Sequence, residues 1–299
     1  MSWLRENTLN WIQYVCLKVV KSGGVPNHVA FIMDGNRRFA KKNNVAKVEG
    51  HTKGFDKLAE TLQWCLDLGI PEVTVYAFSI ENFKRSTEEV NELMDLARDK
   101  FKRLLDEREK LMDHGVSVRV IGNLALLPED LRQLMSEAMI LTKDNNKAFL
   151  NIAFAYTSRD EITSAIKSLV AGVEKKIILP EDISKHVISQ CLYTNKSPNP
   201  DLLIRTSGEI RLSDFLLWQT SSTCVYFSKV LWPEFSVWHM LTAVFHYQRN
   251  RQNIVRLKNF EESCSLESCS LENHQVDLFL EDLHSQRQMF MEKARQGIA

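Results

Sequence analysis

The segment His28-Val29-Ala30-Phe31-Ile32-Met33-Asp34-Gly35-Asn36-Arg37-Arg38-Phe39-Ala40 carries most of the information about fold and site. The uninterrupted apolar run at 29–33 predicts a buried strand. The polar residues that follow predict a sharp turn, and the remaining residues predict a helix. In an open α/β sheet, ligands bind where strands end and helices begin, because free N–H groups and the positive end of the helix dipole face that edge. A candidate ligand site therefore lies at this turn.

The residue types at the turn favour a phosphorylated ligand held together with Mg²⁺. Asp34 can bind a divalent cation, and Gly35 lets the backbone approach a ligand closely. Arg37 and Arg38 can each place a guanidinium fork on phosphate oxygens. The alternative is an ordinary turn in which Asp34 caps the helix and both arginines are solvated; the segment alone leaves the two interpretations open.

The bulk composition is that of a globular protein. A length of 299 residues allows one large or two ordinary domains, and 44% apolar residues can build a sizeable core. The formal net charge of zero gives no overall attraction to nucleic acid. The six cysteines do not have the spacing of metal ligands. We expect them to be the reduced thiols of a protein that faces the cytosol. No uncharged apolar run approaches the ~18–20 residues of a membrane span, and no signal-peptide plan is present, so we expect a soluble or peripheral protein.

Both ends of the chain differ from the middle. Apolar residues over 3–20, among them Trp3 and Trp11, have mostly helical spacing and predict an amphipathic helix ended by Gly23-Gly24. Such a helix suits a membrane surface or the mouth of an apolar site, or it packs on the body of the protein. Beyond 250 the chain turns polar, repeats Glu-Ser-Cys-Ser-Leu, and ends in a predicted helix over 275–295. We therefore divide the chain into an N-terminal amphipathic helix (1–22), a catalytic domain (23–250), and a polar linker with a helical tail (251–299).

Strands and helices alternate through the middle of the chain. Besides the first strand, strands are predicted at 72–78, 116–121, 148–154, just before Arg205, and at 224–227. Helices are predicted at 50–67, 88–114, 128–143 and 159–170, from near Leu212, and from about 235 to near Arg249. This alternation predicts an α/β fold, a mostly parallel sheet with helices on both faces.

Two further strand ends carry the remaining candidate residues. Arg85 follows the second strand and Arg205 ends a later one, with Arg211 and the hydroxyl of Ser213 close behind. The carboxyl ends of parallel strands meet at one edge, so these groups should gather beside the first turn. A single arginine there is usually solvated. Five arginines with one acid favour about two diphosphate groups sharing one metal ion.

These motifs resemble those of the cis-prenyltransferases, the undecaprenyl and dehydrodolichyl diphosphate synthase family, and within it most closely the eukaryotic enzymes. The resemblance covers about residues 25–250, in family order and spacing. The matching segments are His28 to Arg38, Gly50-His51, Ser79-Ile80-Glu81-Asn82-Phe83-Lys84-Arg85-Ser86, Arg205-Thr206-Ser207-Gly208-Glu209-Ile210-Arg211-Leu212-Ser213, Leu216-Leu217-Trp218-Gln219 and Leu231-Trp232-Pro233-Glu234.

The resemblance implies a central six-stranded sheet with an apolar tunnel, and an enzyme that condenses isopentenyl diphosphate onto farnesyl diphosphate with cis stereochemistry. The product would be a long-chain polyprenyl (dehydrodolichyl) diphosphate, precursor of the dolichol carrier for protein glycosylation. By position, Asp34 would bind Mg²⁺ and would be catalytic together with Asn82 and Arg85. The substrate-binding residues would be Gly35, Arg37, Arg38 and His51 for the allylic diphosphate, Arg85, Arg205, Arg211 and Ser213 for isopentenyl diphosphate, and Asn36.

Two departures from the family pattern imply a partner. Homodimeric bacterial members place a metal-binding Glu where this chain has Cys224. Their C-terminal Arg-x-Gly, which completes the neighbouring subunit's site, should fall at 249–254, where there is no glycine; Arg295-Gln296-Gly297 lies some forty residues late. The resemblance therefore implies a heteromer with a Nogo-B receptor-like subunit that anchors the pair peripherally on the cytosolic face of the endoplasmic reticulum membrane.

Three other functions are disfavoured. A non-catalytic lipid-binding or scaffold subunit of such a complex would lack the acid and the arginines, which this chain has. A trans-prenyltransferase would need Asp-Asp-x-x-Asp helices, and no Asp-Asp pair occurs. A nucleotide-binding enzyme would show a phosphate-binding glycine motif, and neither common form is present.

Overall fold

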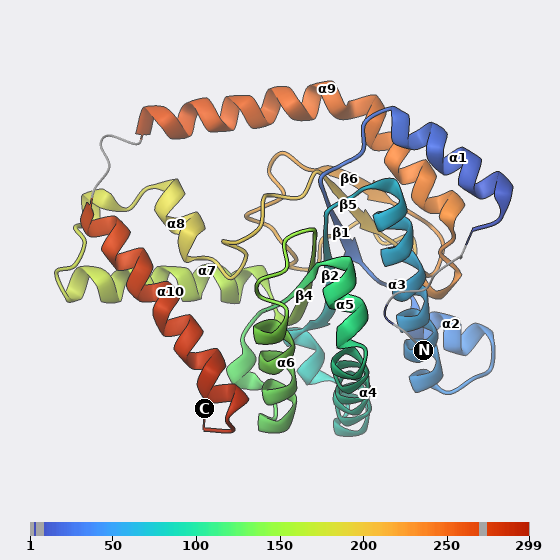
Figure 1. The fold of residues 1–299 in the computed structure, drawn as a ribbon, viewed down its shortest axis with the longest axis horizontal. Coiled ribbons are helices and arrows are strands. Elements are labelled where there is room, and N and C mark those ends of the chain that lie inside the picture. The colour runs from blue at the N-terminus through green and yellow to red at the C-terminus, as the bar shows by residue number, and fades with distance from the viewer. Residues whose placement is uncertain (1–2, 4–8, 269–273, 299) are drawn as a thin grey trace.

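The computed structural model describes residues 3, 9–268 and 274–298, and its centre is a six-stranded parallel sheet (Figure 1). The strand order is β3-β4-β2-β1-β5-β6, and every paired strand runs parallel to its neighbour. The strands are β1 (His28–Ile32), β2 (Glu72–Ser79), β3 (Val116–Ile121), β4 (Ala148–Tyr156), β5 (Leu202–Arg205) and β6 (Cys224–Phe227). The predicted α/β class and six-stranded sheet are confirmed.

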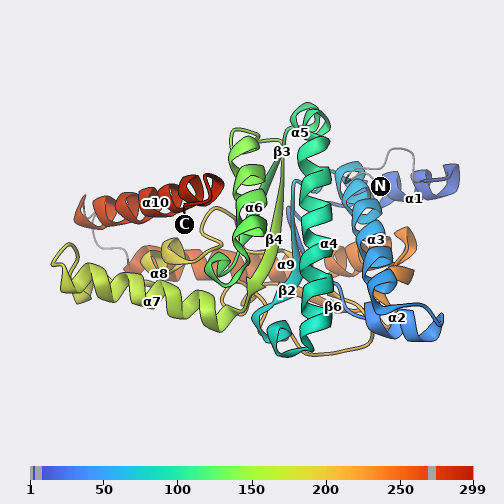
Figure 2. The ribbon, with the colours of Figure 1, turned by 90° about the horizontal axis from the view of Figure 1, so that it is seen from below.

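Ten helices of the described residues surround the sheet. They are α1 (Trp11–Ser22), α2 (Asn36–Lys42), α3 (Lys47–Leu68), α4 (Thr87–Asp106), α5 (Arg108–His114), α6 (Glu129–Leu141), α7 (Ser158–Glu174), α8 (Lys185–Cys191), α9 (Val237–Ser268) and α10 (His274–Arg295). Short 3-10 turns are η1 (Ile80–Lys84), η2 (Leu124–Leu126), η3 (Pro180–Asp182) and η4 (Trp232–Glu234). Figure 2 shows α3, α4 and α6 side by side along one face of the sheet, with α7, α8 and α10 grouped at one end.

The apolar run of the first strand explains its central position. All five residues of β1 are buried, because helices or loops cover both faces of the sheet. Val29 and Phe31 pack into the large core under α3, α4 and α6, whereas Ala30 and Ile32 pack on the opposite face with Phe215. Strands β2 and β5 flank β1, so the ends of the three strands named in the sequence lie next to one another.

Two helix predictions in the middle of the chain were wrong. The helix expected over 88–114 is broken at Glu107 into α4 and α5. The helix expected from near Leu212 is absent: residues 206–223 form turns, with positive φ at Ser213 and Asp214. These turns are fixed to the start of α7, where Ser158 N donates to Asp214 O at 2.8 Å and Arg159 Nε donates to Asp214 Oδ2 at 2.8 Å.

The two ends of the chain also differ from expectation. Helix α1 begins at Trp11, and Trp3 lies outside it with its side chain buried in the core. The helix expected to end near Arg249 continues as α9 to Ser268, so the stretch predicted as a linker is helical up to that residue. The second Glu-Ser-Cys-Ser-Leu copy falls largely outside the described residues. The predicted final helix is confirmed as α10.

In the part of the chain that the structure describes, no helix has the length and apolar character needed to cross a membrane. The four cysteines whose side chains are described (Cys16, Cys65, Cys191 and Cys224) are free thiols.

Candidate active site

The turn after β1 is held on three sides. Gly35 has φ of 108°, and a Cβ there would lie 3.0 Å from Leu231 Cδ2 and 3.2 Å from the Leu231 Cα, so glycine is required by both conformation and space. The backbone N–H of Asp34 donates to Thr206 Oγ1 at 3.1 Å, and its carbonyl accepts from Thr206 Oγ1 at 2.8 Å and from Trp232 N at 3.0 Å. Segments from three parts of the chain therefore fix the position of Asp34.

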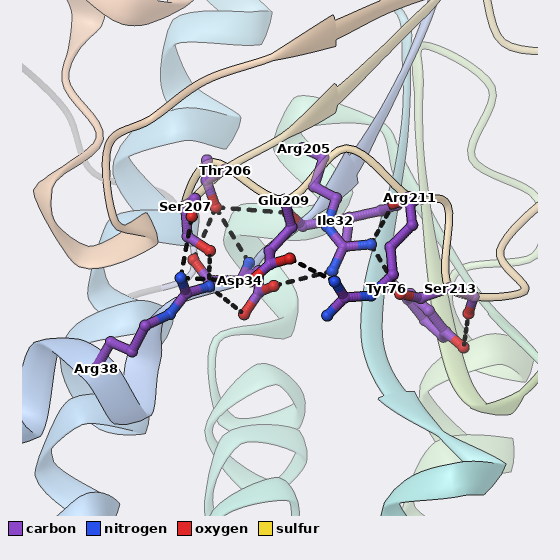
Figure 3. Close-up of polar contacts among 10 residues, drawn as sticks. All are labelled: Ile32, Asp34, Arg38, Tyr76, Arg205, Thr206, Ser207, Glu209, Arg211 and Ser213. Carbon is purple, nitrogen blue, oxygen red and sulfur yellow. Dashed lines mark hydrogen bonds and ion pairs between the residues drawn. The ribbon is translucent and has the colours of Figure 1, made fainter.

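The Asp34 carboxylate lies between two guanidinium groups (Figure 3). Arg205 Nη2 donates to Asp34 Oδ2 at 3.0 Å, and Arg38 Nη2 lies 3.5 Å from Asp34 Oδ1. Partial burial alone would raise the pKa of Asp34, but the hydrogen bond and charge of Arg205, together with the charge of Arg38, hold that pKa below its usual range. Asp34 is therefore ionised at neutral pH and can bind a cation.

Arg205 joins the separate segments of the site. Its side chain is only 3% exposed, and besides Asp34 it donates from Nη1 to Ser213 Oγ at 2.7 Å and to the carbonyl oxygen of Arg211. The Nε of Arg205 is buried and has no hydrogen-bond partner among the described residues. The turn that replaces the expected helix thus places Ser213 where it meets the Arg205 fork.

More exposed arginines surround this buried pair. Arg38 donates to Ser207 O at 3.1 Å and to the Ser207 hydroxyl, and lies 3.5 Å from Glu209. Arg211 pairs with Glu209. The side chains of Arg38 and Arg211 are 47% and 65% exposed, so both can turn toward a ligand at the edge of the sheet.

A second group of cations is centred on Glu89, which the sequence analysis did not identify. Glu89 Oε1 lies 2.9 Å from Arg85 Nη1 and 3.7 Å from Arg37 Nη1, and its Oε2 lies 3.3 Å from Lys47 Nζ. Burial opposes ionisation of Glu89, but Lys47 and both arginines outweigh it and lower its pKa. The only sequence signal at Glu89 was its spacing from the helix cap Ser86, whose hydroxyl accepts from Glu89 N at 3.3 Å.

His51 lies beside these cations in its neutral form. Burial, reinforced by the charges of Arg85 and Arg37, lowers the pKa of His51 to about 4. Its Nε2 and the side-chain oxygen of Asn36 are both buried without hydrogen-bond partners among the described residues. Helices α2 and α3 meet closely here, since a Cβ on Gly50 would lie 2.5 Å from Asn36 O. Asn82 accepts a hydrogen bond from Ser79 N at 3.0 Å and so shapes the turn that carries Arg85.

An apolar cavity opens next to His51 and Asn36. It has a volume of about 130 Å³ and lies between the sheet and helices α3 and α4, with Phe55 and Phe101 in its wall. A smaller cavity of about 30 Å³ lies deeper under the same helices, and Trp3 lines both. The Trp3 Nε1 donates to Lys100 O at 2.9 Å, and its ring packs edge-on against Phe55 with centroids 4.7 Å apart. This is the space in which the expected tunnel would run.

The protein groups near Asp34 suit a metal ion that is coordinated mainly by atoms of a bound small molecule. Among the described residues no cluster of three or more His, Cys, Asp or Glu could hold a metal ion. Mg²⁺ is commonly bound by one or two carboxylates together with substrate phosphates, and Asp34 has the kind of carboxylate that such a site needs. Cys224 pairs with Leu202 at the amino end of β5, whereas Arg205 pairs with Phe227. A glutamate in place of Cys224 would therefore lie about 10 Å from this edge in the same chain.

The late Arg295-Gln296-Gly297 segment lies on another part of the molecule. It follows α10 and packs on α6, where Gln133 Nε2 donates to Arg295 O at 3.0 Å. Residues 249–254, where the family motif was expected, are inside α9.

The fold and the site together define a class of protein: a parallel α/β protein whose sheet edge carries five arginines around the acids Asp34, Glu89 and Glu209, beside an apolar cavity. Comparisons with known proteins agree with this class. A family model described as putative undecaprenyl diphosphate synthase matches residues 32–254. The chain is 56% identical over 259 residues to a subunit of the dehydrodolichyl diphosphate synthase complex of Homo sapiens, covering 87% of this chain and 78% of the relative.

A more distant relative and a solved structure also match the chain. The chain is 43% identical to the geranylgeranyl-diphosphate-specific tritrans,polycis-undecaprenyl-diphosphate synthase of Pyrococcus furiosus, covering 80% of this chain and 90% of the relative. The crystal structure of lavandulyl diphosphate synthase from Lavandula x intermedia, in complex with dimethylallyl diphosphate, has a TM-score of 0.71 and 37% identity, covering 75% of this chain and 95% of that one.

The chain belongs to the undecaprenyl diphosphate synthase family, the cis-prenyltransferases, and is an enzyme of prenyl chain elongation. The expectation drawn from the resemblance is confirmed at this level, and the scaffold alternative is set aside.

Proposed function

We propose that this chain is the catalytic subunit that condenses isopentenyl diphosphate onto farnesyl diphosphate with cis stereochemistry, making the long-chain dehydrodolichyl diphosphate from which the dolichol glycosyl carrier is derived. The observation that carries the proposal is the ionised Asp34 held by Arg205 and Arg38 at the sheet edge, beside a cavity of apolar side chains. The human relative is named as a subunit of a dehydrodolichyl diphosphate synthase complex, which supports the choice of product.

The arrangement suits cleavage of an allylic C–O bond. That cleavage leaves a delocalised carbocation and a diphosphate, so the enzyme must stabilise the leaving charge and hold the second alkene against the cation. We assign Arg37, Arg38 and neutral His51 to the allylic diphosphate, with the backbone at Gly35 and the side chain of Asn36 beside it. The isopentenyl diphosphate is then held by Arg85, Arg205, Arg211 and Ser213.

Asp34 is the residue that we assign to Mg²⁺, through its carboxylate and together with the allylic diphosphate. When bound, the ion supplies positive charge that neutralises the diphosphate leaving group. Asn82 lies in the short turn η1 after β2 and Arg85 follows that turn directly, and we assign both residues to the neighbourhood of the reacting carbons.

The buried Glu89 is expected to position Arg85 for the substrate. Replacing it by Gln removes the charge that holds Arg85, Arg37 and Lys47, and these cations will then repel one another. We expect the KM for isopentenyl diphosphate to rise about tenfold, the equivalent of about 1.4 kcal/mol, with a smaller change in kcat. Steady-state kinetics will measure this. Glu88→Gln, on the exposed side of the same helical turn, is the matched control; equal KM values for both variants would contradict the positioning role.

We also propose a heteromer with a Nogo-B receptor-like subunit, peripheral to the cytosolic face of the endoplasmic reticulum membrane. The human and mouse relatives are named as complex subunits, and this chain lacks the Arg-x-Gly motif at its expected position. Helix α1 supports a peripheral location, because it exposes Trp11 (78%), Ile12 (59%) and Val19 (67%) on its surface.

Partner dependence is tested by expressing the chain alone and together with that subunit. The single chain should incorporate labelled isopentenyl diphosphate weakly, and co-expression should raise turnover at least about tenfold, because the partner supplies groups to the site. Product chain length is read from the same reaction. Full turnover by the purified single chain would count against the heteromer while leaving the assignment of the reaction intact.

A further inference from the structure

A second cavity lies on the β3 side of the sheet, away from the candidate active site. Its volume is about 790 Å³, within the range of about 300–1,000 Å³ typical of small-molecule sites. The walls come from β3, α6, α7, the loop after α8, and α10. None of the candidate active-site residues lines it. The active-site chemistry therefore does not account for this cavity.

Cations from four different parts of the chain line this cavity. They are Arg119 on β3, Lys143 after α6, Lys196 in the loop after α8, and Arg287 on α10, against the two carboxylates of Asp144 and Glu292. Arg119 lies 3.6 Å from Glu72, but among the described residues neither Lys196 nor Arg287 forms an ion pair with a carboxylate. Four cations thus line the cavity against two carboxylates, with a third carboxylate, Glu72, beside Arg119.

The cations are held in place by neutral groups. Arg119 Nη1 donates to Lys196 O at 2.9 Å and to Ser197 Oγ at 3.3 Å, and Arg287 donates to Leu192 O at 2.9 Å. These bonds fix both guanidinium groups on the loop that carries Lys196. Asn195 on the same loop is 2.7 Å from the His284 Nε2 of α10. A preorganised set of cations loses little side-chain entropy when an anion binds.

The pKa shifts of two lining side chains, Lys196 and His284, agree with nearby positive charge. Burial lowers the pKa of Lys196, and the charges of Arg119 and Arg287 lower it further. Burial also lowers the pKa of His284, again reinforced by Arg287 and Lys196. The charged forms of Lys196 and His284 are thus destabilised by neighbouring cations, and a bound anion would relieve that repulsion.

A buried amide side chain, that of Asn151, also lines the cavity. Asn151 on β4 is 1% exposed, and its Nδ2 donates to Glu72, Thr74 and Ser197. Its Oδ1 is buried and has no hydrogen-bond partner among the described residues. Apolar side chains such as Leu283 and Phe290 line the α10 side. The lining therefore combines cations that suit a phosphate group with apolar side chains that suit the organic part of a ligand.

We propose that this cavity is a second binding site, which takes a small phosphorylated molecule with its phosphate between Lys196, Arg287 and Arg119. The site joins the sheet to the C-terminal helix, because Arg119 belongs to β3 and Arg287 to α10. Because the ligand would bind only when α10 is packed on the rest of the molecule, binding in this cavity stabilises that packing. The site does not depend on the reaction assigned to the sheet edge.

Hydrogen–deuterium exchange of α10 in the full chain tests this proposal, with inorganic diphosphate as the probe and no added Mg²⁺. The active site also binds diphosphate, but no active-site residue lies on α10, so protection of this helix reports on the second cavity. We expect slower exchange over residues 284–291 when inorganic diphosphate is added. In Lys196→Gln the half-saturating concentration of diphosphate should rise by about tenfold or more, the equivalent of about 1.4 kcal/mol. Lys185→Gln, an exposed lysine on α8, is the control.

The same measurement with geranyl diphosphate separates two sources of the phosphate. Equal affinity for both probes supports a site for a free phosphate group, and tighter binding of geranyl diphosphate supports a site for a prenyl diphosphate. Exchange of α10 that does not respond to either probe, or that responds equally in Lys196→Gln, would overturn the proposal. Asp34→Ala should leave the α10 response intact, so failure here is distinguishable from failure of the assigned reaction.

Discussion

Asp34→Ala abolishes incorporation of labelled isopentenyl diphosphate, with an expected loss in kcat of about 10³-fold or more. The expectation follows from the position of the carboxylate, which is ionised, held by Arg205 and Arg38, and the residue assigned to the metal on the leaving diphosphate. Loss of one preorganised charge-stabilising group in an active site commonly costs about 10²–10³-fold in kcat, and loss of a metal ligand adds to this.

The control for this variant is Asp95→Ala on α4. Its side chain is 74% exposed and pairs only at the surface with Arg98, so turnover should be unchanged. Circular dichroism should show both variants folded. Mg²⁺-dependent binding of a farnesyl diphosphate analogue should weaken for Asp34→Ala alone. Undiminished turnover of a folded Asp34→Ala protein would refute the catalytic assignment.

Arg205→Gln is expected to impair both catalysis and stability. The guanidinium is buried and is shared by Asp34, Ser213 and the carbonyl of Arg211, so its loss leaves a partly buried carboxylate without its main partner. Removing one partner of a buried ion pair typically costs about 3–5 kcal/mol; because the Asp34 side chain is 31% exposed, we expect about 2–3 kcal/mol here, with at least a 10²-fold fall in kcat/KM. Urea denaturation and kinetics measure the two effects.

The pH dependence of stability gives a separate check on the same pair. Arg205 lowers the pKa of Asp34 in the folded state, so the pair stabilises the fold above the unfolded pKa of about 3.9. That contribution is lost as the pH falls through the lower, folded pKa. Arg205→Gln should therefore lose less stability than the native protein between neutral pH and strongly acid pH. The control is Arg108→Gln, because Arg108 is exposed and forms no ion pair among the described residues, so this variant should keep the native profile. Identical profiles for the native protein and Arg205→Gln would contradict the coupling.

Much of the fold could be predicted because its strands are defined by local pattern. A strand buried on both faces needs an unbroken apolar run, and residues 29–33 have one. The chain direction of a βα unit then fixes which end of each strand meets the ligand, so Asp34, Arg85 and Arg205 could be assigned to one edge without coordinates. The helix predictions that failed, at Glu107 and after Leu212, lie where a distant part of the chain forms a hydrogen bond: Trp3 N donates to Glu107 Oε2, and Arg159 Nε donates to Asp214 Oδ2.

The sequence by itself determined the class of fold, the sheet edge that carries the site, and the family, because each depends on residue types at short spacing. Only the tertiary structure decided how the charged side chains pair: Arg205 is buried against Asp34, and Glu89 forms ion pairs with Arg37 and Arg85. It also decided that Cys224 lies at the opposite end of β5 and β6 from the site. It also placed Trp3 in the apolar cavity and opened the basic cavity under α10. These arrangements join residues far apart in the chain, and the free energy that fixes them comes from burial and charge pairing in the folded state rather than from any local preference.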